Sequence, residues 1–118
     1  PFKSKPELIN SIFQNLIENA VKYSKEPSEN HTPIIDIAVK YRNEELMIVI
    51  SDNGTGIKKQ CIKNIFDLYY KSCDKDVSGS GLGLYIVKSI VESFDGNIKV
   101  NSDFNNGACF KIHLPQLK

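Results

Sequence analysis

A long amphipathic segment between residues 8 and 24 is the feature that most limits the folds open to this chain. Its apolar residues recur at helical spacing, so one broad face of a helix is expected to be buried. These residues are Leu8, Ile9, Ile12, Phe13, Leu16, Ile17, Ala20 and Val21. Such a face needs a second layer of structure to cover it.

Three polar residues follow one flank of this expected helix. Asn15, Asn19 and Lys22 are spaced at i, i+4 and i+7, which stacks them on the same side. Asn19 falls at the border of the apolar arc, where a carboxamide without a partner costs about 1–3 kcal/mol. Asparagine also lowers helix propensity, and conflicts with local rules tend to mark functional sites. A solvated polar edge is the alternative, and this helix alone does not decide between the two.

Size, charge and hydropathy exclude several classes of protein. A chain of 118 residues forms one domain with a single hydrophobic core. The net charge of +1 is too small for a nucleic-acid-binding surface, so no nucleic-acid partner is expected. The longest wholly apolar run, residues 46–50, is far too short to span a membrane, and no signal peptide is visible.

The three cysteines indicate a reducing compartment. Cys61, Cys73 and Cys109 are odd in number and form no CxxC pair, which favours free thiols over a disulfide framework or a zinc site. The chain begins abruptly at Pro1-Phe2, close to the expected helix. We therefore expect a cytoplasmic module of a longer protein.

Alternating and continuous apolar stretches predict a first hairpin. Residues 35–41 alternate apolar and polar side chains and predict a half-buried strand. Residues 46–50 are apolar on both faces, which is typical of a central strand. The short turn at residues 42–44 is expected to pair them.

The second half of the chain predicts two helices and a second hairpin. A short helix is expected within residues 58–65, and an amphipathic helix from Leu84 to Phe94 with a glycine stop at Asp95-Gly96. Strands are expected at residues 98–100 and 108–114, with an Asn-Asn-Gly hairpin signal between them. The order of elements predicts an α+β fold, a two-layer α/β sandwich in which a mixed sheet of about four to five strands carries about three helices on one face.

A glycine-rich run before the second amphipathic helix is a plausible phosphate site. In Gly79-Ser80-Gly81-Leu82-Gly83 the backbone can approach an anion, and the free N–H groups of a helix start supply donors. The spacing alone is a weak signal, because short glycine patterns also form tight turns. The run does not follow a strand and lacks the GKS/T of a P-loop, so a dinucleotide fold is disfavoured.

Asp52 and the two asparagines suggest the rest of a nucleotide site. Asp52 precedes two glycines and is suited to accept a hydrogen bond from an adenine amino group, although a plain Asp-Asn-Gly turn is equally credible in isolation. The carboxamide oxygens of Asn15 and Asn19 suit Mg²⁺, a hard cation that also takes phosphate oxygens. Lys22 would then neutralise phosphate charge.

Four motifs occur in one order along the chain. They are N-L-I-E-N-A-V-K-Y-S at residues 15–24, D-N-G-T-G-I at 52–57, I-F-D-L-Y-Y at 65–70 and G-S-G-L-G-L at 79–84. This combination resembles the asparagine, first glycine, phenylalanine and second glycine boxes of the catalytic ATP-binding domain of two-component sensor histidine kinases, which belong to the GHKL superfamily. The resemblance covers nearly the whole chain, from about residue 7 to residue 114.

The resemblance implies a role for each motif residue, with ATP and Mg²⁺ as cofactors. Asn19 would be the Mg²⁺ ligand, Asn15 would support the metal–phosphate cluster, and Lys22 would contact phosphate. Asp52 would bind the adenine amino group, and Phe66 would anchor the near end of a mobile lid. The other implied nucleotide-binding residues are Tyr23, Gly54, Gly56, Ile57, Tyr70, Lys71, Gly79, Ser80, Gly81, Leu82, Gly83 and Leu84.

The resemblance also bears on the reaction. Hydrolases of the superfamily usually place a glutamate four residues before the metal-binding asparagine, where it activates water. Asn15 fills that position here and cannot act as a base, which favours phosphoryl transfer through positioning and charge neutralisation. A nucleotide-binding regulatory module without kinase activity is the alternative.

The expected partners lie outside these residues. Neither His31, in a polar loop, nor His113, on the non-core face of the last strand, has the helical-hairpin context of an acceptor. The acceptor histidine is therefore expected on a separate dimerisation and phosphoacceptor domain, with a response regulator downstream. Membrane contact is expected only through absent parts of the parent.

Three departures from the family pattern have structural consequences. Lys71 stands where many relatives carry arginine, and Ala108-Cys109 stands near a position where relatives often carry serine or threonine. The family's edge strand before the first helix is missing. A four-stranded sheet with an exposed edge is therefore expected.

Overall fold

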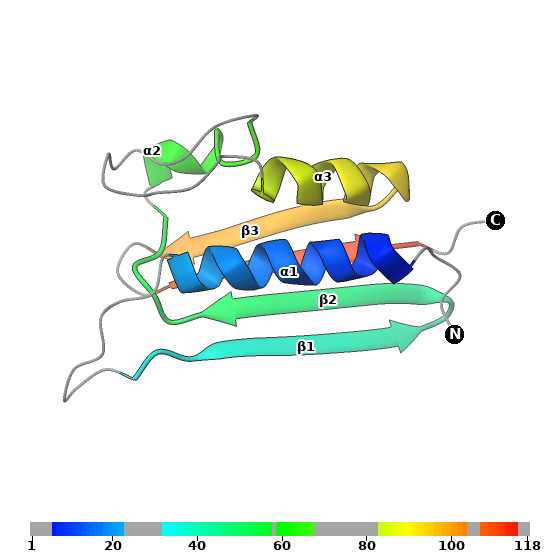
Figure 1. The fold of residues 1–118 in the computed structure, drawn as a ribbon, viewed down its shortest axis with the longest axis horizontal. Coiled ribbons are helices and arrows are strands. Elements are labelled where there is room, and N and C mark those ends of the chain that lie inside the picture. The colour runs from blue at the N-terminus through cyan, green and yellow to red at the C-terminus, as the bar shows by residue number, and fades with distance from the viewer. Residues whose placement is uncertain (1–5, 23–31, 58, 68–82, 104–106, 116–118) are drawn as a thin grey trace.

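The protein is a two-layer sandwich of helices on an antiparallel sheet. The computed structural model describes residues 6–22, 32–57, 59–67, 83–103 and 107–115. The elements are α1 (Pro6–Lys22), β1 (Ile35–Arg42), β2 (Glu45–Asp52), α2 (Lys59–Ile62), α3 (Gly83–Ser93), β3 (Asn97–Asp103) and β4 (Gly107–Leu114). The helices α1 and α3 pack against each other and lie on one face of the sheet (Figure 1). The predicted α+β class is confirmed.

The strand order is β1-β2-β4-β3, and every pairing is antiparallel. Both predicted hairpins are present, as β1–β2 and β3–β4. The prediction of a mixed sheet is wrong among the described strands. The strands β2 and β3 run in the same direction, but β4 inserts between them and pairs with both, so no parallel pair forms.

The turn between β1 and β2 has the geometry that a two-residue hairpin requires. Asn43 and Glu44 both have positive φ, at 54° and 65°, and Arg42 pairs directly with Glu45. Turns with two positive φ angles match the right-handed twist of paired strands. The turn therefore sets which residues of β1 and β2 lie opposite each other.

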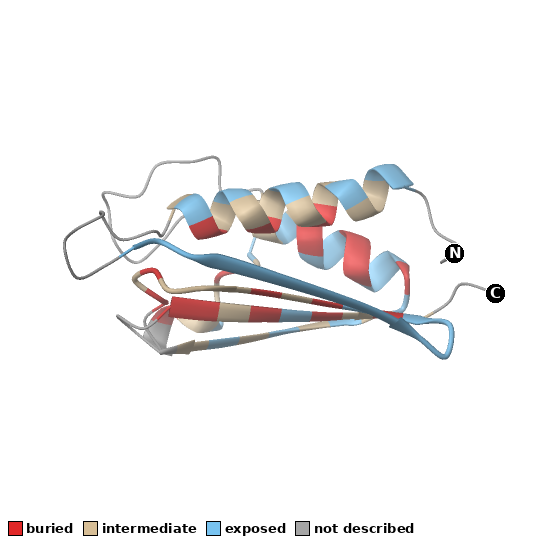
Figure 2. Cartoon of the chain, turned by 90° about the horizontal axis from the view of Figure 1, so that it is seen from below, coloured by how far each residue is buried: buried red, intermediate tan, exposed pale blue. Residues whose placement is uncertain are grey.

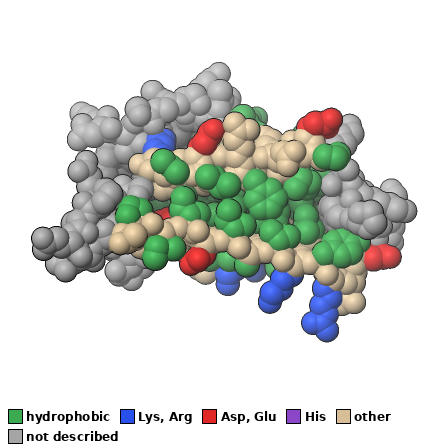
Figure 3. Space-filling view, turned by 60° about the horizontal axis from the view of Figure 1, so that its bottom comes forward, with side chains coloured by type: hydrophobic (Ala, Val, Ile, Leu, Met, Phe, Trp, Pro, Cys, Tyr) green, Lys and Arg blue, Asp and Glu red, His purple; other side chains and the backbone are tan. Residues whose placement is uncertain are grey.

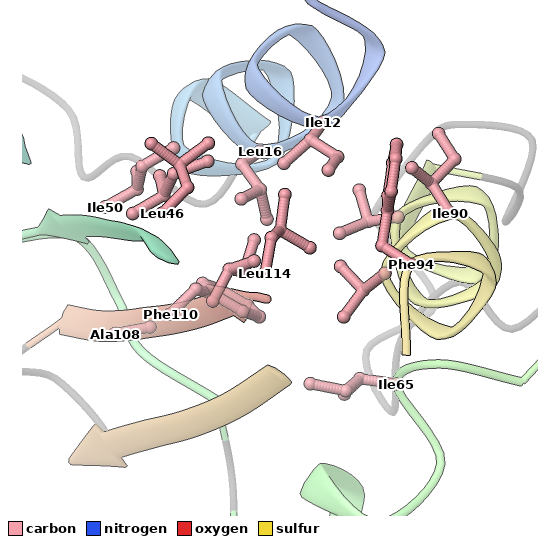
Figure 4. Close-up of a cluster of buried hydrophobic side chains, with 14 of the residues drawn as sticks. Ile12, Leu16, Leu46, Ile50, Ile65, Ile90, Phe94, Ala108, Phe110 and Leu114 are labelled. Carbon is pink, nitrogen blue, oxygen red and sulfur yellow. The ribbon is translucent and has the colours of Figure 1, made fainter. Parts of the chain in front are cut away.

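The core lies between the two helices and the inner face of the sheet. Figure 4 shows Ile12 and Leu16 of α1, Ile90 of α3 and Phe94 just after α3 in one cluster with side chains of the sheet. The alternation of β2 and β4 predicts this arrangement, because every second residue of a strand faces the same side. Their fully or nearly buried residues are Leu46, Ile48, Ile50, Ala108, Phe110, Ile112 and Leu114.

The end of α3 departs from the predicted glycine stop. Asp95, not Gly96, has the left-handed backbone, with φ of 58°. Gly96 N–H donates to the Val91 carbonyl and Asp95 N–H to the Glu92 carbonyl, both at 3.0 Å, which is the hydrogen-bond pattern of a Schellman motif. Gly96 is required for another reason, because a Cβ there would overlap the carbonyl oxygen of His113.

The strand β1 is exposed along its whole length, whereas the alternation predicted a half-buried strand (Figure 2). Its apolar residues do face the same side as the core, since Ile37 pairs with Ile50 and Val39 with Ile48. The helix α1 lies over β2, however, and none of the described elements covers β1. Ile37 and Val39 are therefore 46% and 50% exposed.

The uncovered side carries a continuous apolar face. Figure 3 shows hydrophobic side chains gathered in a band along this side of the molecule. The exposed apolar residues on this face of β1 are Ile35, Ile37, Val39 and Tyr41. The expected exposed edge of a four-stranded sheet is thus present, and its inner face is apolar.

The cysteines differ in part from the prediction of free thiols. Cys109 is free, but Cys61 is buried and disulfide-bonded. Cys73 lies outside the described residues. A pairing without CxxC spacing depends on tertiary proximity and is not visible in a sequence. None of the helices that the structure describes is long and apolar enough to cross a bilayer.

Candidate functional site

The predicted polar flank of α1 is formed. Asn15, Asn19 and Lys22 all lie within α1 and are partly buried. The Asn15 side chain is held by its own helix, because its Nδ2 donates to the Ser11 carbonyl at 2.8 Å and to Ser11 Oγ at 3.2 Å. These bonds occupy the amide hydrogens and leave the carboxamide oxygen to face outward from the helix.

The oxygen of Asn15 lies against the start of α3. A Cβ placed on Gly83 would be 3.2 Å from Asn15 Oδ1, which is closer than most side chains approach. Glycine at this position therefore lets the first residue of α3 pack against α1. The asparagine box and the end of the second glycine box are adjacent, as the sequence predicts, and Leu84 packs partly buried beside the core.

Asn19 lies at the border of the buried face of α1, where its carboxamide needs a hydrogen-bond partner. Its carboxamide makes no hydrogen bond within the part of the chain that the structure describes, although the residue is partly buried. A partly buried polar group without a partner is unfavourable unless a ligand or water completes it. Lys22 lies one turn further along the same flank.

The first glycine box forms a compact loop at the end of β2. The Asp52 carboxylate accepts a hydrogen bond from Gly54 N–H at 2.8 Å, which closes an Asx turn. Gly56 has φ of 72°, a conformation that favours glycine. Gly54, Gly56 and Ile57 are buried. The loop thus presents backbone and one carboxylate at the same place.

Asn53 holds this loop by two hydrogen bonds to residues that precede β1. It was not singled out from the sequence. Its Oδ1 accepts a hydrogen bond from Ile34 N–H at 2.8 Å, and its Nδ2 donates to the Thr32 carbonyl at 2.9 Å. These bonds tie the loop to the residues that precede β1. The Asp-Asn-Gly pattern was visible in the sequence, but the partners of Asn53, 19 and 21 residues away, were not.

Phe66 packs as part of an aromatic pair. Its ring meets that of Phe110 edge-to-face, with centroids 6.4 Å apart and planes at 84°. Lys88 of α3 places its Nζ 5.7 Å from the centroid of Phe66, within the range of a cation–π contact. The residue expected to anchor the lid is therefore held by both the sheet and α3.

An open pocket of about 430 Å³ lies at the ends of β2, β3 and β4. Its lining residues are Ser51, Asp52, Asn101, Ser102, Gly107, Ala108 and Cys109. Asp52 lines this pocket, and Ala108 and Cys109, noted as departures from the family, line it too. Ser102 and Gly107 were missed, although a serine at a core-facing strand position was a visible signal.

The described site residues lie in one half of the sandwich. Figure 1 shows the end of α1 and the end of β2 at the same end of the molecule, with the beginning of α3 set further inward. The residues of α1 do not line the pocket that contains Asp52. Seven predicted site residues lie outside the described part of the chain, namely Tyr23, Tyr70, Lys71, Gly79, Ser80, Gly81 and Leu82.

The chemistry of the site fits Mg²⁺ bound together with a polyphosphate. No group of three or more His, Cys, Asp or Glu side chains suited to a metal exists among the described residues. A cage made of protein carboxylates is therefore absent from that part of the chain. Mg²⁺ usually takes one or two protein oxygens and completes its shell with water and phosphate, and the unpartnered carboxamide of Asn19 fits this role.

Comparison with known proteins places the chain in one family. Residues 4–118 match the family described as histidine kinase-, DNA gyrase B-, and HSP90-like ATPase. The chain belongs to this family, and its helices on an antiparallel sheet form a catalytic domain of the histidine kinase type.

Its similar proteins are sensor kinases of bacteria. The chain is 43% identical to the sensor protein RprX of Bacteroides fragilis (strain YCH46), over 99% of this chain and 22% of that protein. It is 40% identical to the signal transduction histidine-protein kinase ArlS of Staphylococcus haemolyticus (strain JCSC1435), over 81% of this chain and 21% of that protein. The chain thus spans about a fifth of the length of these relatives.

Solved structures share the fold. The mycobacterial sensor histidine kinase MprB is similar with a TM-score of 0.81 and 25% identity, over 98% of this chain and 76% of that one. The catalytic domain of the histidine kinase ThkA has a TM-score of 0.77 and 22% identity, over 96% of this chain and 70% of that one.

Proposed function

We propose that this chain binds Mg-ATP and transfers the γ-phosphoryl group to a histidine on a separate dimerisation and phosphoacceptor domain. The observation that carries the proposal is the flank of α1. There the Asn19 carboxamide has no hydrogen-bond partner among the described residues, and Asn15, one turn earlier, lies against the start of α3. A metal-bound triphosphate would complete this polar flank.

Each of the following site residues has a role in this proposal. Asp52 accepts a hydrogen bond from the adenine amino group, and the buried glycines of its loop let the base lie against backbone. Asn19 would hold Mg²⁺, which neutralises charge on the transferring phosphoryl group, and Asn15 would support the metal–phosphate cluster. Lys22 adds positive charge on the same flank, and Gly83 and Leu84 begin the helix that faces the phosphates.

The same residues favour transfer over hydrolysis. The side chain of Asn15 is a neutral amide whose hydrogens are bonded within α1, so it does not take a proton from water. Catalysis then consists of positioning and charge neutralisation, and the nucleophile comes from the partner domain. The seven site residues outside the described part of the chain belong to the proposal through their motifs alone.

The names of the relatives extend the proposal to a signalling pathway. RprX is a sensor protein and ArlS a signal transduction histidine-protein kinase. We infer that the chain acts in two-component signalling, with a response regulator as the final acceptor, and that it works on the cytoplasmic side of the parent sensor.

Substitution of Asn19 tests the proposal. In the full-length parent kinase, Asn19→Ala is expected to lower the initial rate of histidine phosphorylation by about 100-fold or more, because it removes a ligand that acts on the transferring group. The measurement is incorporation of γ-labelled ATP into acid-labile phosphate. Asn10→Ala is the matched control, since Asn10 is an exposed asparagine of the same helix, and its rate should remain unchanged.

The alternative of a regulatory nucleotide-binding module predicts another result. Tight ATP binding by the full-length protein without phosphate on any histidine would support that alternative and exclude the kinase. Steady release of phosphate from the isolated chain would instead indicate a hydrolase.

A further inference from the structure

The loop that carries Asp52, residues 52–57, has two hydrogen bonds of its own, from Gly54 N–H to Asp52 and from Thr55 Oγ1 to the Gly56 carbonyl. One oxygen of the Asp52 carboxylate accepts the Gly54 N–H bond at 2.8 Å, and the other accepts no hydrogen bond among the described residues. The direction of this second oxygen therefore depends on the conformation of the whole loop, residues 52–57. What fixes the loop determines where the carboxylate points.

The hydroxyl of Ser102 at the end of β3 fixes the far end of this loop. Ser102 Oγ accepts a hydrogen bond from Ile57 N–H at 2.6 Å and donates one to the Gly107 carbonyl at 3.2 Å. The first bond joins residues 45 positions apart in the sequence. Ser102 lies on the same side of β3 as Ile98 and Val100, which pack against the core. A polar side chain at such a position needs partners, and the loop and hairpin supply them.

The near end of the loop rests on Gly107, the first residue of β4. Gly107 has φ of 97°, and a Cβ there would overlap the carbonyl oxygen of Asp52. A Cβ at Gly107 would also lie 3.0 Å from the Cα of Asn53. The β3–β4 hairpin thus contacts the loop at both ends, once through backbone packing and once through a hydroxyl.

These contacts are part of one pocket. Asp52, Ser102 and Gly107 all line the same open pocket of about 430 Å³. Ala108, paired with Ser102 across the hairpin, has no hydroxyl to offer a ligand. The pocket is also lined by Ser51 and Asn101, but among its lining residues only Ser102 is hydrogen-bonded to the loop that carries Asp52.

We propose that Ser102 is a positioning residue for recognition of the adenine base. Its hydroxyl holds the Ile57 amide, and through it the loop that directs the Asp52 carboxylate toward the ligand. The inference rests on the ATP site proposed above. It assigns no contact between Ser102 and the nucleotide.

The test compares the Ser102→Ala variant with a control variant, Ser93→Ala. Ser93→Ala removes a hydroxyl of the same kind, which donates to the Ile90 carbonyl at 2.6 Å at the end of α3, away from the pocket. Titration calorimetry on the 118-residue chain should show the Kd for Mg-ATP rising about three- to tenfold in Ser102→Ala, the usual size of one lost hydrogen bond. Ser93→Ala should leave the Kd unchanged, and Ser102→Thr should restore it.

Two further measurements separate positioning from a purely structural role. Amide exchange at Ile57, followed by NMR, should accelerate in Ser102→Ala alone. In the full-length kinase the substitution should raise KM for ATP and leave kcat unchanged, because the loop acts on binding of the base. Asp52→Asn marks the effect of losing the direct contact and should weaken binding more than Ser102→Ala.

Each contrary result has one meaning. Faster exchange at Ile57 with an unchanged Kd would overturn the inference and leave Ser102 a structural residue. An equal loss of affinity in Ser93→Ala would also overturn it, since the effect would then be general destabilisation. If the unaltered chain fails to bind Mg-ATP, the proposed function itself is wrong. If the unaltered chain binds and Ser102→Ala binds with the same Kd, only the inference about Ser102 is wrong.

Discussion

Single residues in this domain are constrained by close backbone approaches as much as by conformation. At the end of α3 the left-handed residue is Asp95, whereas Gly96 has ordinary φ and touches the His113 carbonyl. The sequence Asp95-Gly96 suggested the reverse assignment, because glycine is the usual left-handed residue after a helix. Asp95 therefore supplies the left-handed backbone that ends the helix, and Gly96 is required because a side chain would collide with β4.

Substitution of these two neighbours tests that distinction. Gly96→Ala should lower the free energy of unfolding by about 1–3 kcal/mol, because the added methyl displaces the β4 backbone. Asp95→Gly should leave the free energy of unfolding unchanged or raise it by up to about 1 kcal/mol. Glycine relieves the left-handed backbone of a non-glycine residue, but it also gives the unfolded chain more conformational freedom, and the two effects oppose each other. Urea unfolding followed by circular dichroism measures both. A larger loss in Asp95→Gly than in Gly96→Ala would show that the assignment is wrong.

Among the elements, β1 departs most from its sequence pattern. Ile35, Ile37, Val39 and Tyr41 alternate as core residues do, and they face the core side of the sheet. Burial of a strand face nevertheless requires a covering layer, and α1 reaches only β2. The alternation thus predicted the correct face and the wrong exposure.

Identical substitutions at two paired isoleucines measure this difference. Ile37 and Ile50 are direct partners in β1 and β2, with exposures of 46% and 2%. Ile50→Thr should destabilise the fold by about 2–4 kcal/mol, because it opens a cavity and buries a hydroxyl. Ile37→Thr should cost about 0.5 kcal/mol or less, as surface substitutions do. Equal costs in chemical denaturation would mean that β1 is covered in solution.

At the scale of the whole molecule, the proposed site occupies one end and His113 lies toward the other. Six residue steps along β4 lead from Gly107, at the site, to His113, which corresponds to roughly 20 Å of strand. His113 Nε2 also lies 3.3 Å from Glu45 Oε2, on the outer face of the sheet. A phosphoryl group bound at the site is therefore out of reach of this histidine within one chain.

Labelling of the isolated chain tests whether His113 accepts a phosphoryl group. Incubation of the 118-residue chain with γ-labelled ATP should leave no acid-labile phosphate on His113, and His113→Gln should not alter ATP binding. Peptide mapping of the labelled chain is the measurement. Phosphate on His113 would contradict the arrangement and would remove the need for a separate acceptor domain.

Much of the fold was predictable because its signals are local. The period of the apolar residues identified α1, α3 and all four strands, and turn residues identified both hairpins. The ordered motifs nominated Asn15, Asn19, Asp52 and Phe66, and the structure shows contacts that hold Asn15, Asp52 and Phe66. The motifs did not reveal Ser102 or Asn53, because their roles depend on partners 45 and about 20 residues away.

The sequence by itself determined which segments are helices and strands, which side of each is apolar, and which residues are candidates for the site. These properties follow from side-chain periodicity and backbone preference within a few neighbouring residues. Only the tertiary structure decided that β1 stays uncovered, that β4 lies between β2 and β3, and that Ser102 holds the loop of Asp52. Burial, strand order and long-range hydrogen bonds depend on what packs from elsewhere in the chain, and no local pattern contains that information.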